Sequence, residues 1–223
     1  MIPLMIKLIS FDMDKTLVKS TYADLVWLEG LPKIYALDKK IDLEKAKQFL
    51  LEKYGEIGEE RLEWYDIEYW FNRFNLKYNW RELLEKYRYE IETYSEVTNV
   101  LGRLYKQFDL IIASNARREF IEVELEETKL RKYFTHVFSS TSDFNKVKKV
   151  TEFYSMICSK MNIHPYEMIH IGDHEEFDYN IPRELGITSF HLDREKTNEG
   201  NFIVSDLKEF EERINKFTNS HEI

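Results

Sequence analysis

Residues 6–17 read IKLISFDMDKTL and pass from an apolar run directly into two acidic residues. Leu8, Ile9 and Phe11 belong to residue types that favour β-strands, and the run is short enough to be one buried strand. Asp12 and Asp14 would then follow the carboxyl end of that strand, which is where open α/β sheets bind their ligands. This stretch therefore predicts the first strand of a sheet and the position of a functional site.

Asp12 and Asp14 are two carboxylates one residue apart, and they repel each other unless a cation or a proton neutralises them. Mg²⁺ is the usual cation, because it prefers oxygen ligands and is held by one or two carboxylates together with substrate phosphate. The structural alternative is that both residues end the strand as turn residues and that Thr16 caps the next element. The short motif by itself leaves both interpretations open.

Length and composition set limits on the class of protein. The chain has 223 residues, enough for one large core or for a core with a smaller second domain. Hydrophobic residues make up 43% and charged residues 33%, which is the balance of a soluble globular protein. The net charge of −9 argues against a nucleic-acid partner, because binding a phosphate backbone needs clustered Lys and Arg.

No apolar run approaches the roughly 18 residues of a membrane span, so no membrane partner is expected. Residues 1–6 are apolar but are interrupted by Pro3, followed by Lys7 and free of a small-residue cleavage site. They are expected to lead into the first strand rather than to form a signal peptide. The single cysteine, Cys158, cannot form an internal disulfide, and the expected localisation is cytoplasmic. Nothing in the sequence indicates the oligomeric state.

Residues 19–92 are dense in aromatic and charged side chains and lack an alternating strand pattern, which predicts a group of helices. Asp42 is expected to begin one helix, and Gly55 is expected to end it. A second helix is expected over residues 62–74, and Asn79 is expected to cap a third. The aromatic residues of these helices are better explained by a packed core than by a ligand site.

The remainder of the chain alternates between apolar runs and helical patterns. Strands are expected at 110–113, 136–138, 168–171 and 188–192, and helices near 96–105, from 118, at 151–161, near 175–185 and from 206. This alternation predicts the α/β class, a Rossmann-like parallel sheet with helices on both faces. The expected domains are a core of residues 1–18 and 93–223 and an inserted α-helical domain of residues 19–92.

Polar residues follow three of the expected strands. Ser114 and Asn115 follow the second strand, and Asp173 follows Gly172 at the end of the fourth. The carboxyl ends of parallel strands share one edge, so these residues should converge with Asp12 and Asp14. Each has a structural explanation when taken alone, Ser114 as a helix cap and Asp173 as a turn residue. Their joint occurrence at strand ends favours a functional site.

Taken in chain order, the residues near these strand ends resemble the four motifs of the haloacid dehalogenase superfamily of aspartate-nucleophile hydrolases. Residues 12–16 match D-x-D-x-T, Ser114 with Asn115 matches the Ser/Thr motif, Lys148 matches the lysine motif, and residues 172–178 match G-D-x-x-x-x-D. The resemblance covers residues 1–18 and 93–223 and is highly specific as a set. An inserted helical cap at the position of residues 19–92 is usual in this family.

Three features depart from the family pattern, one of which is Ile181-Pro182 in place of a common Gly-Ala after the acidic motif. Lys15 stands where many members have glycine, and the lysine motif lacks its usual proline, since Lys149 follows Lys148. Lys146 is a rival for the lysine role, because it lies two residues earlier in the same loop. Lys148 is preferred, because its distance along the chain to Gly172 matches the family.

The resemblance implies a role for each of these residues. Asp12 would be the nucleophile, and Asp14 would be the general acid and then the general base. Ser114, Asn115 and Lys148 would hold the phosphoryl oxygens. The implied ligands of a Mg²⁺ cofactor are Asp12, the backbone carbonyl of Asp14, and Asp173, while Asp178 and Thr16 would lie around this group, with Asp178 orienting Lys148 or a metal-bound water.

The implied function is that of a Mg²⁺-dependent phosphatase, a hydrolase of a small phosphorylated metabolite that acts through a phosphoaspartate. A 2-haloacid dehalogenase is the less favoured alternative, because those enzymes resemble D-x-x-x-T without a second acid, and Asp14 supplies one. A phosphotransferase or phosphomutase would share every core residue named here. A receiver domain, which only accepts phosphate, lacks a helical insertion after its first acids. The sequence does not identify the substrate.

Overall fold

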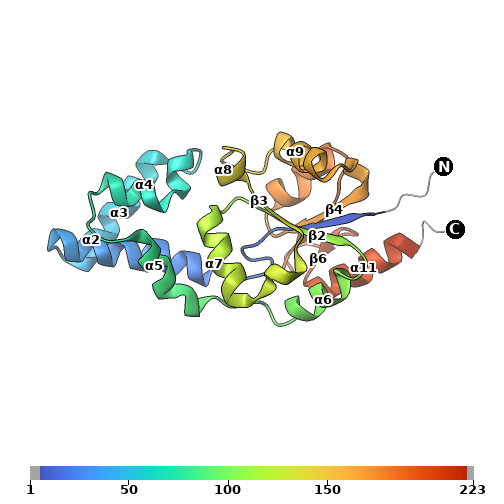
Figure 1. Cartoon of the computed structure of the whole chain (residues 1–223), viewed down its shortest axis with the longest axis horizontal. Helices are drawn as coiled ribbons and strands as arrows, with labels where there is room; N and C mark the ends of the chain where they lie inside the picture. The colour runs from blue at the N-terminus through green and yellow to red at the C-terminus, as the bar shows by residue number, and fades with distance from the viewer. Residues whose placement is uncertain (1–5, 220–223) are drawn as a thin grey trace.

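A six-stranded parallel sheet forms the centre of the protein (Figure 1). The computed structural model describes residues 6–219 and orders the strands β3-β2-β1-β4-β5-β6. They are β1 (Leu8–Phe11), β2 (Asp109–Ser114), β3 (His136–Ser139), β4 (Met168–Gly172), β5 (Thr188–Leu192) and β6 (Ile203–Val204). The predicted parallel α/β sheet is confirmed. β6 was not predicted, because two residues are too few to show a pattern.

The first strand lies inside the sheet, between β2 and β4. Phe11, its last residue, is level with Ile112 of β2 and with Ile171 of β4. The chain order reverses at β1, because β2 and β3 lie to one side of it and β4, β5 and β6 lie to the other. Such a switch point opens a crevice at the carboxyl ends of the central strands, where α/β proteins bind ligands.

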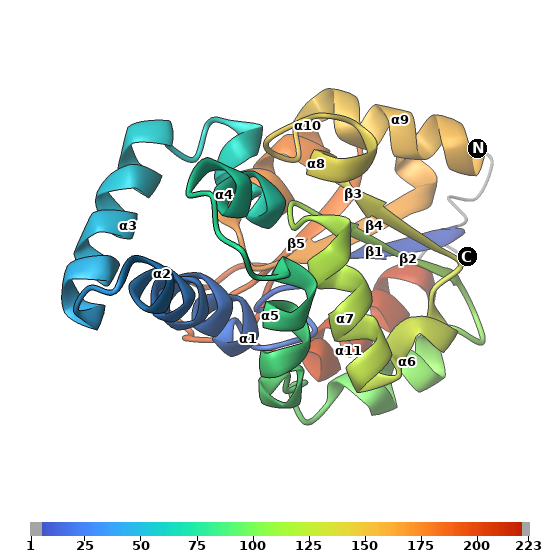
Figure 2. The ribbon, with the colours of Figure 1, turned by 60° about the vertical axis from the view of Figure 1, so that its left-hand side comes forward.

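Helices cover both faces of the sheet (Figure 2). One face carries α6 (Val97–Leu104), α7 (Arg118–Thr128) and α11 (Leu207–Asn219), and the other carries α9 (Thr151–Met161), α10 (Ile181–Glu184) and a π-helical turn at Glu175–Asn180. Side chains of β1 alternate between the two apolar layers, with Ile9 and Phe11 in one and Leu8 in the other. Short elements complete the connections: α8 (Ser140–Asp143) and 3₁₀ turns at Leu130–Tyr133 and Pro165–Glu167.

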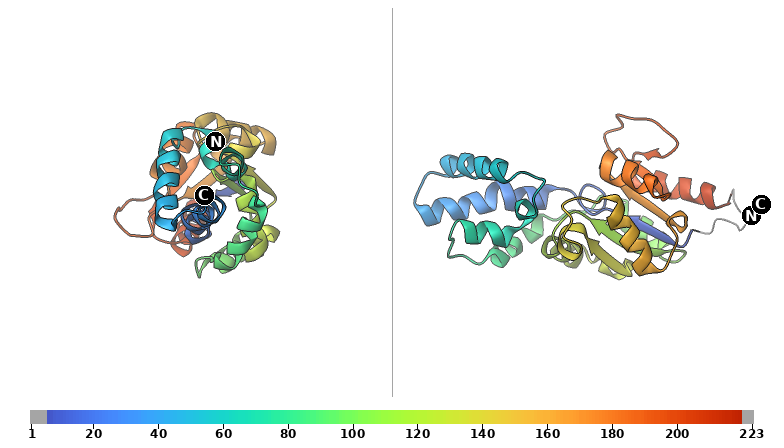
Figure 3. Two further views of the ribbon diagram at one scale, coloured as in Figure 1. Left: turned by 90° about the vertical axis from the view of Figure 1, so that its left-hand side faces the viewer. Right: turned by 90° about the horizontal axis from the view of Figure 1, so that it is seen from above.

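The segment between β1 and α6 is helical, as predicted. It contains α1 (Thr21–Leu25), a π-helical turn (Val26–Gly30), α2 (Leu31–Lys39), α3 (Leu43–Ile57), α4 (Ile67–Arg73), α5 (Trp80–Tyr87) and 3₁₀ turns at Leu62–Tyr65 and Arg88–Glu90. We call residues 19–92 the inserted segment. Figure 3 shows its helices beside the sheet along the long axis of the molecule.

Two predicted helix boundaries in the inserted segment are wrong. Asp42 caps α3 as expected and accepts from the amides of two following residues, but α3 continues through Gly55 to Ile57. A glycine inside a helix costs only about 1 kcal/mol, and the chain leaves the helix at Gly58, whose φ is +78°. The single helix predicted over 62–74 is divided at Asp66, whose carboxylate caps α4.

The inserted segment shares an apolar core with one face of the sheet. Trp27 stacks on Phe120 of α7, with ring centroids 5.7 Å apart, and Tyr22 lies 5.9 Å from the same ring. The first helices of the segment are therefore anchored on α7, next to the carboxyl end of β1. Residues 1–5, expected to lead into β1, lie outside the described residues. Within residues 6–219, no helix has the length and apolar character needed to span a membrane.

Candidate active site

Asp12 follows β1 directly and is held on several sides. Its backbone N–H donates to the carbonyl of Ile171 at 2.9 Å, which continues the pairing of β1 with β4. The residue is 6% exposed. Its carboxylate accepts from Lys149 Nζ at 2.5 Å through Oδ1 and lies 3.5 Å from Thr16 Oγ1 through Oδ2. Asp12 is thus a buried carboxylate of fixed orientation at the crevice predicted from the sheet.

Lys149, and not Lys148, reaches this carboxylate, so the predicted position of the site lysine is corrected. Lys149 is 1% exposed and is the only described lysine that contacts Asp12; it also donates to the carbonyl of Ala113 at 3.3 Å. Lys148 instead pairs with Glu60 of the inserted segment at 2.6 Å. The two side chains diverge in a tight turn that is closed by a hydrogen bond from Val150 N–H to the Lys148 carbonyl.

Asp178 is the second partner of Lys149 and is also fully enclosed. It accepts from the backbone N–H of His174 at 3.1 Å and lies 2.9 Å from His170 Nε2. Burial raises its pKa, but the charge of Lys149 and hydrogen bonds from His170 and Lys149 outweigh burial and hold the pKa below its usual value. Asp178 therefore stays ionised and fixes the ammonium group against Asp12. A Cβ at Gly172 would lie 2.3 Å from Asp178 Cγ, which explains this glycine.

His170 supports Asp178 from inside the sheet, and the sequence analysis did not identify it. Its Nδ1 lies 2.9 Å from Ser10 Oγ, and its Nε2 lies 3.1 Å from the hydroxyl of Tyr154. Burial lowers the pKa of His170. A histidine in the middle of the apolar run that forms β4 was the available signal, but its partners come from β1 and α9 and are distant in sequence.

Among residues 6–219, Asp12, Asp173 and Asp178 form a group of side chains suited to hold a metal ion. One oxygen from each lies within 4.8 Å of the others. Opposite ligands of Mg²⁺ are about 4.2 Å apart, so a small contraction would bring this oxygen-only set into range. Asp178 is already paired with Lys149, which leaves Asp12 and Asp173 as the freer ligands. The Asp14 side chain is not part of this group. The group is made of side-chain oxygens alone, whereas the predicted Asp14 ligand is a backbone carbonyl.

The carboxyl groups of this cluster carry more negative charge than Lys149 can balance. Burial, and then the charges of Asp178 and Asp173, raise the pKa of Asp12 well above its usual value, although Lys149 opposes them. Burial and the charge of Asp178 likewise raise the pKa of Asp173. A divalent cation would relieve this repulsion, so the charge balance fits Mg²⁺ as well as the ligand atoms do.

Asp14 lies two residues beyond Asp12 but in a different environment. Its Oδ1 is buried without a hydrogen-bond donor among the described residues. Burial, together with the charge of Asp173, raises its pKa to about 6. A carboxyl group that titrates near neutral pH can act as both a general acid and a general base. The same region contains Glu124 of α7, which is 1% exposed and which the sequence analysis missed.

Ser114 is the last residue of β2, and Asn115 follows it at the same edge of the sheet as Asp12. Ser114 is buried, and its Oγ accepts from the backbone N–H of Ala116 at 3.1 Å, which shapes the turn into α7. The side-chain oxygen of Asn115 accepts from Ser140 Oγ at 3.0 Å, which ties this turn to the start of α8. The sequence predicted both residues at this edge of the sheet. The structure adds that the Asn115 side-chain oxygen is already hydrogen-bonded to Ser140, the first residue of α8.

The loop that contains Lys15 is clamped by Arg194. Lys15 has a φ of +55°, a left-handed conformation that suits glycine better and costs other residues about 1–2 kcal/mol. The Arg194 guanidinium donates to the carbonyls of Lys15 and Thr16, at 3.1 and 2.8 Å. It also lies 3.4 Å from the ring centroid of Tyr94 and pairs with Glu96 at 2.9 Å. These contacts hold the left-handed backbone of Lys15 in place.

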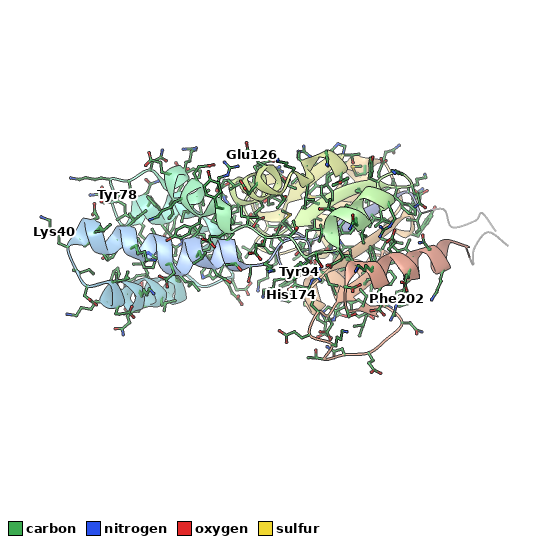
Figure 4. All side chains as sticks on the ribbon, turned by 90° about the horizontal axis from the view of Figure 1, so that it is seen from below. Lys40, Tyr78, Tyr94, Glu126, His174 and Phe202 are labelled. Atoms are coloured by element: carbon green, nitrogen blue, oxygen red, sulfur yellow. The ribbon has the colours of Figure 1, made fainter. Side chains whose placement is uncertain are left out.

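A cavity of about 290 Å³ lies next to this clamp and reaches the metal-binding group. It is lined by Lys15, Tyr94, Asp173, His191, Leu192, Asp193, Arg194, Glu195 and Thr197. Figure 4 shows Tyr94 and His174 at the junction between the inserted segment and the sheet. A larger hollow of about 1110 Å³ beside the loop at 193–205 contains none of the four site aspartates.

Comparisons with known proteins agree with this architecture. The profile of the family described as haloacid dehalogenase-like hydrolase matches residues 9–192. A HAD phosphatase from Thermococcus onnurineus superposes with a TM-score of 0.81 at 21% identity, covering 94% of this chain and 98% of that one. A 2-haloacid dehalogenase from Pseudomonas syringae pv. Tomato DC3000 gives 0.70 at 17% identity, covering 96% and 100%.

A third structure, described as a predicted phosphoglycolate phosphatase from Haemophilus somnus 129pt, gives a TM-score of 0.61 at 17% identity, covering 92% of this chain and 96% of that one. The comparison with curated proteins gives no match. At these identities the structural neighbours show the fold alone, while the family profile spans most of the sheet and all four strand-end motifs. The chain belongs to the haloacid dehalogenase-like hydrolase family.

Proposed function

We propose that this protein is a Mg²⁺-dependent phosphomonoester hydrolase that acts on a small phosphorylated metabolite through a phosphoaspartate on Asp12. The observation that carries the proposal is the combination of a buried Asp12, fixed by Lys149, with a second acid, Asp14, whose pKa lies at about 6. The first supplies an oriented nucleophile, and the second supplies a proton near neutral pH.

In the first step, a carboxylate oxygen of Asp12 attacks phosphorus, and the bond from phosphorus to the substrate oxygen breaks. Protonated Asp14 gives its proton to that oxygen, so an alcohol leaves. Lys149 holds a phosphoryl oxygen together with Ser114 and the nearby backbone amides. The charges of Asp12 and Asp178 hold the pKa of Lys149 above its usual value despite burial, so its positive charge is present throughout.

In the second step, Asp14 acts as a base. It takes a proton from a water molecule, whose oxygen attacks the phosphorus of the phosphoaspartate. The bond between phosphorus and Asp12 breaks, which releases inorganic phosphate and restores the Asp12 carboxylate. The proton taken from water leaves Asp14 protonated, as it was before the first step. A pKa of about 6 suits both the acid role and the base role of Asp14, because neither its protonated nor its ionised form is strongly favoured near neutral pH.

Asp12 and Asp173 would hold Mg²⁺, with the backbone carbonyl of Asp14 as a third ligand. When bound, the ion would supply positive charge between the nucleophile and the phosphate oxygens, which otherwise repel each other. Asp178 would keep Lys149 in place rather than occupy the metal, because its carboxylate already pairs with that lysine and with His170.

We propose that the inserted segment, residues 19–92, is a cap over a catalytic core of residues 1–18 and 93–223. Two ion pairs support this division, since each joins the inserted segment to a core loop next to a site residue. Glu60 pairs with Lys148, next to Lys149, and Asp66 pairs with Arg117 at 3.0 Å, just after the turn of Ser114. A cap in this position would exclude water and select the substrate.

The dehalogenase alternative is supported by a structural neighbour but not by Asp14. A halide leaves without needing a proton, so a displacement at carbon gives Asp14 no acid role. A phosphotransferase would use the same residues with a second alcohol in place of water, and analysis of the products distinguishes it from a phosphatase.

The test is a screen of phosphomonoesters with Mg²⁺ or with a chelator, scored by released inorganic phosphate, using wild type, Asp12→Asn and Asp109→Asn. Asp12→Asn should be inactive, because an amide cannot attack phosphorus or balance the charge of the metal. Asp109→Asn is the matched control, because this exposed acid lies at the amino end of β2. Phosphate release by purified Asp12→Asn would rule out the mechanism, and turnover of 2-chloropropionate alone would favour the dehalogenase.

A further inference from the structure

Three consecutive hydroxyl residues, Ser139, Ser140 and Thr141, end β3 and begin α8. All three are fully buried. Ser139 is level with Ser114 in the pairing of β3 with β2, so these hydroxyls lie against the turn that follows Ser114. A buried hydroxyl needs a hydrogen-bond partner, and the partners of all three belong to that turn.

Two of the hydroxyls hold the backbone of the turn. Ser139 Oγ donates to the carbonyl of Ala116 at 2.7 Å, and Thr141 Oγ1 donates to the carbonyl of Asn115 at 3.1 Å. From the other side, the N–H of Ala116 donates to Ser114 Oγ at 3.1 Å. Two consecutive carbonyls and the amide between them are therefore fixed, and the turn is held in one conformation.

The turn begins beside the nucleophile of the proposed mechanism. Lys149 Nζ, which contacts the carboxylate of Asp12, also donates to the carbonyl of Ala113 at 3.3 Å. Ala113 is two residues before Asn115 on the same strand end. A phosphoryl group attached to Asp12 would thus lie next to this turn.

Ser140 acts on a side chain of the turn rather than on its backbone. Its Oγ donates to Oδ1 of Asn115 at 3.0 Å, so the oxygen of this amide faces α8. The amide group is planar, and its nitrogen, Nδ2, is therefore directed away from Ser140. Among residues 6–219, Nδ2 has no hydrogen-bond acceptor, and Asn115 is partly exposed. Two N–H donors are thus available at the edge of the sheet where phosphate would bind.

We propose that Ser140 is a positioning residue that holds the Asn115 side chain with its amide nitrogen toward the phosphoryl oxygens of the substrate. The inference rests on the proposed function, because the orientation matters only when a phosphoryl group is bound. Without the Ser140 hydroxyl, the amide could turn over about its Cβ–Cγ bond. Its oxygen would then face the phosphoryl oxygens and repel them instead of stabilising their charge.

The experiment is a double-substitution cycle with 4-nitrophenyl phosphate and Mg²⁺, using wild type, Ser140→Ala, Asn115→Ala and the double variant. Ser140→Ala removes only Oγ, since the Ser140 carbonyl still accepts from the N–H of Lys146 at 2.9 Å. Ser142→Ala is the matched control, because Ser142 lies on the same helix and its hydroxyl accepts from the N–H of Arg118 instead. The measured quantities are kcat/KM and the inhibition constant of inorganic phosphate.

We expect Asn115→Ala to lose about 10²–10³-fold in kcat/KM, the usual effect of removing one donor that stabilises developing charge. Ser140→Ala should lose about 3–10-fold, the size of one neutral hydrogen bond, because the donor remains but is no longer held in place. In the Asn115→Ala background, the same change should cost less than about twofold, since Ser140 then has no amide to orient. Phosphate should inhibit both single variants more weakly, and Ser142→Ala should match wild type within about twofold.

Asn115→Asp tests the direction of the amide without altering Ser140. One carboxylate oxygen can still accept from the Ser140 hydroxyl, while the other would replace Nδ2 and repel the phosphoryl oxygens. This variant should therefore be at least as impaired as Asn115→Ala.

Three results would overturn the inference: an unchanged Ser140→Ala enzyme, a loss from Ser140→Ala that is as large in the Asn115→Ala background as in wild type, or an Asn115→Asp enzyme as active as wild type. Each leaves the proposed function intact, because wild type still releases phosphate and Asp12→Asn still does not. If wild type hydrolyses no phosphomonoester, the proposed function fails, and the role of Ser140 fails with it.

Discussion

Replacing Lys149 by methionine, with Lys148→Met as its neighbour control, tests the centre of the site. Methionine keeps the apolar stem and removes the ammonium group. In Lys149→Met, the carboxylates of Asp12 and Asp178 lose their shared cation in a fully buried setting. In Lys148→Met, the lost partner is Glu60, whose side chain is 75% exposed.

The two substitutions should differ strongly in stability. Breaking a buried ion pair by removing one partner costs about 3–5 kcal/mol, whereas an exposed pair contributes about 0–1 kcal/mol. For a chain of this size, 1 kcal/mol shifts the melting temperature by about 2–4 °C. We therefore expect Lys149→Met to melt about 6–20 °C below wild type and Lys148→Met at most about 4 °C below it, as measured by circular dichroism in a chelator at pH 7.5.

The difference between Lys149→Met and wild type should narrow as the pH falls. Lys149 holds the pKa of Asp178 in the folded protein below its value in the unfolded chain. The stability that this pair contributes is therefore present above the pKa of the unfolded chain and is lost as the pH falls through the pKa of the folded protein. In the variant, the unpaired carboxylates take up protons more readily, so acidification relieves them. Melting curves from pH 7.5 to about pH 4 would show the two proteins converging.

Activity provides the second measurement. Lys149→Met should lose about 10²–10³-fold in phosphate release, the usual effect of removing one group that stabilises developing charge, and Lys148→Met should stay within a few-fold of wild type. The reasoning is refuted if Lys148→Met is the inactive protein, or if the two variants melt at the same temperature.

Two other substitutions give three further expected outcomes. Asp14→Asn should give a burst of 4-nitrophenol followed by a slow steady rate, because water attack on the phosphoaspartate needs the base; absence of a burst together with equal loss on alkyl phosphates would contradict the roles assigned. Without metal, the same variant should be more stable than wild type by about 3 kcal/mol at pH 7.5, because burial raises the Asp14 pKa from 3.8 to about 6 and the ionised form therefore opposes folding. This gain in stability should fade between about pH 6 and pH 4. A gain that persists at pH 4 would argue against this cause. Gly172→Ala should displace Asp178, because the new Cβ meets its side chain at 2.3 Å, so both the melting temperature and activity should fall, and a neutral result would show that the loop adjusts freely.

The sheet and the strand-end positions were predictable, because both follow from local pattern. An apolar run followed by Asp12, repeated before Ser114 and Asp173, identifies parallel strands and their shared edge without any knowledge of contacts. The positions of Asp12 and Asp173 then follow from topology. The broken helix at 62–74 was missed because Asp66 looks like any polar helix residue until its side chain is seen to cap α4.

The residues that were misplaced or missed depend on contacts between distant parts of the chain. Choosing between Lys148 and Lys149 required the direction of each side chain in a tight turn, and spacing along the sequence cannot resolve one residue. His170 is a single polar residue within an apolar pattern, and its place in the site comes from its contact with Asp178. Asp178 belongs to another element of secondary structure, so the pattern of β4 gives no sign of the contact.

The stacking of Trp27 on Phe120 couples the inserted segment to α7, the helix that follows the Ser114 turn at the end of β2. Arg117, the residue just before α7, is also paired with Asp66 of the inserted segment. A swing of the inserted segment that keeps both contacts would carry the start of α7 with it. The edge of the sheet that holds Asp12 would then change shape whenever the inserted segment moves.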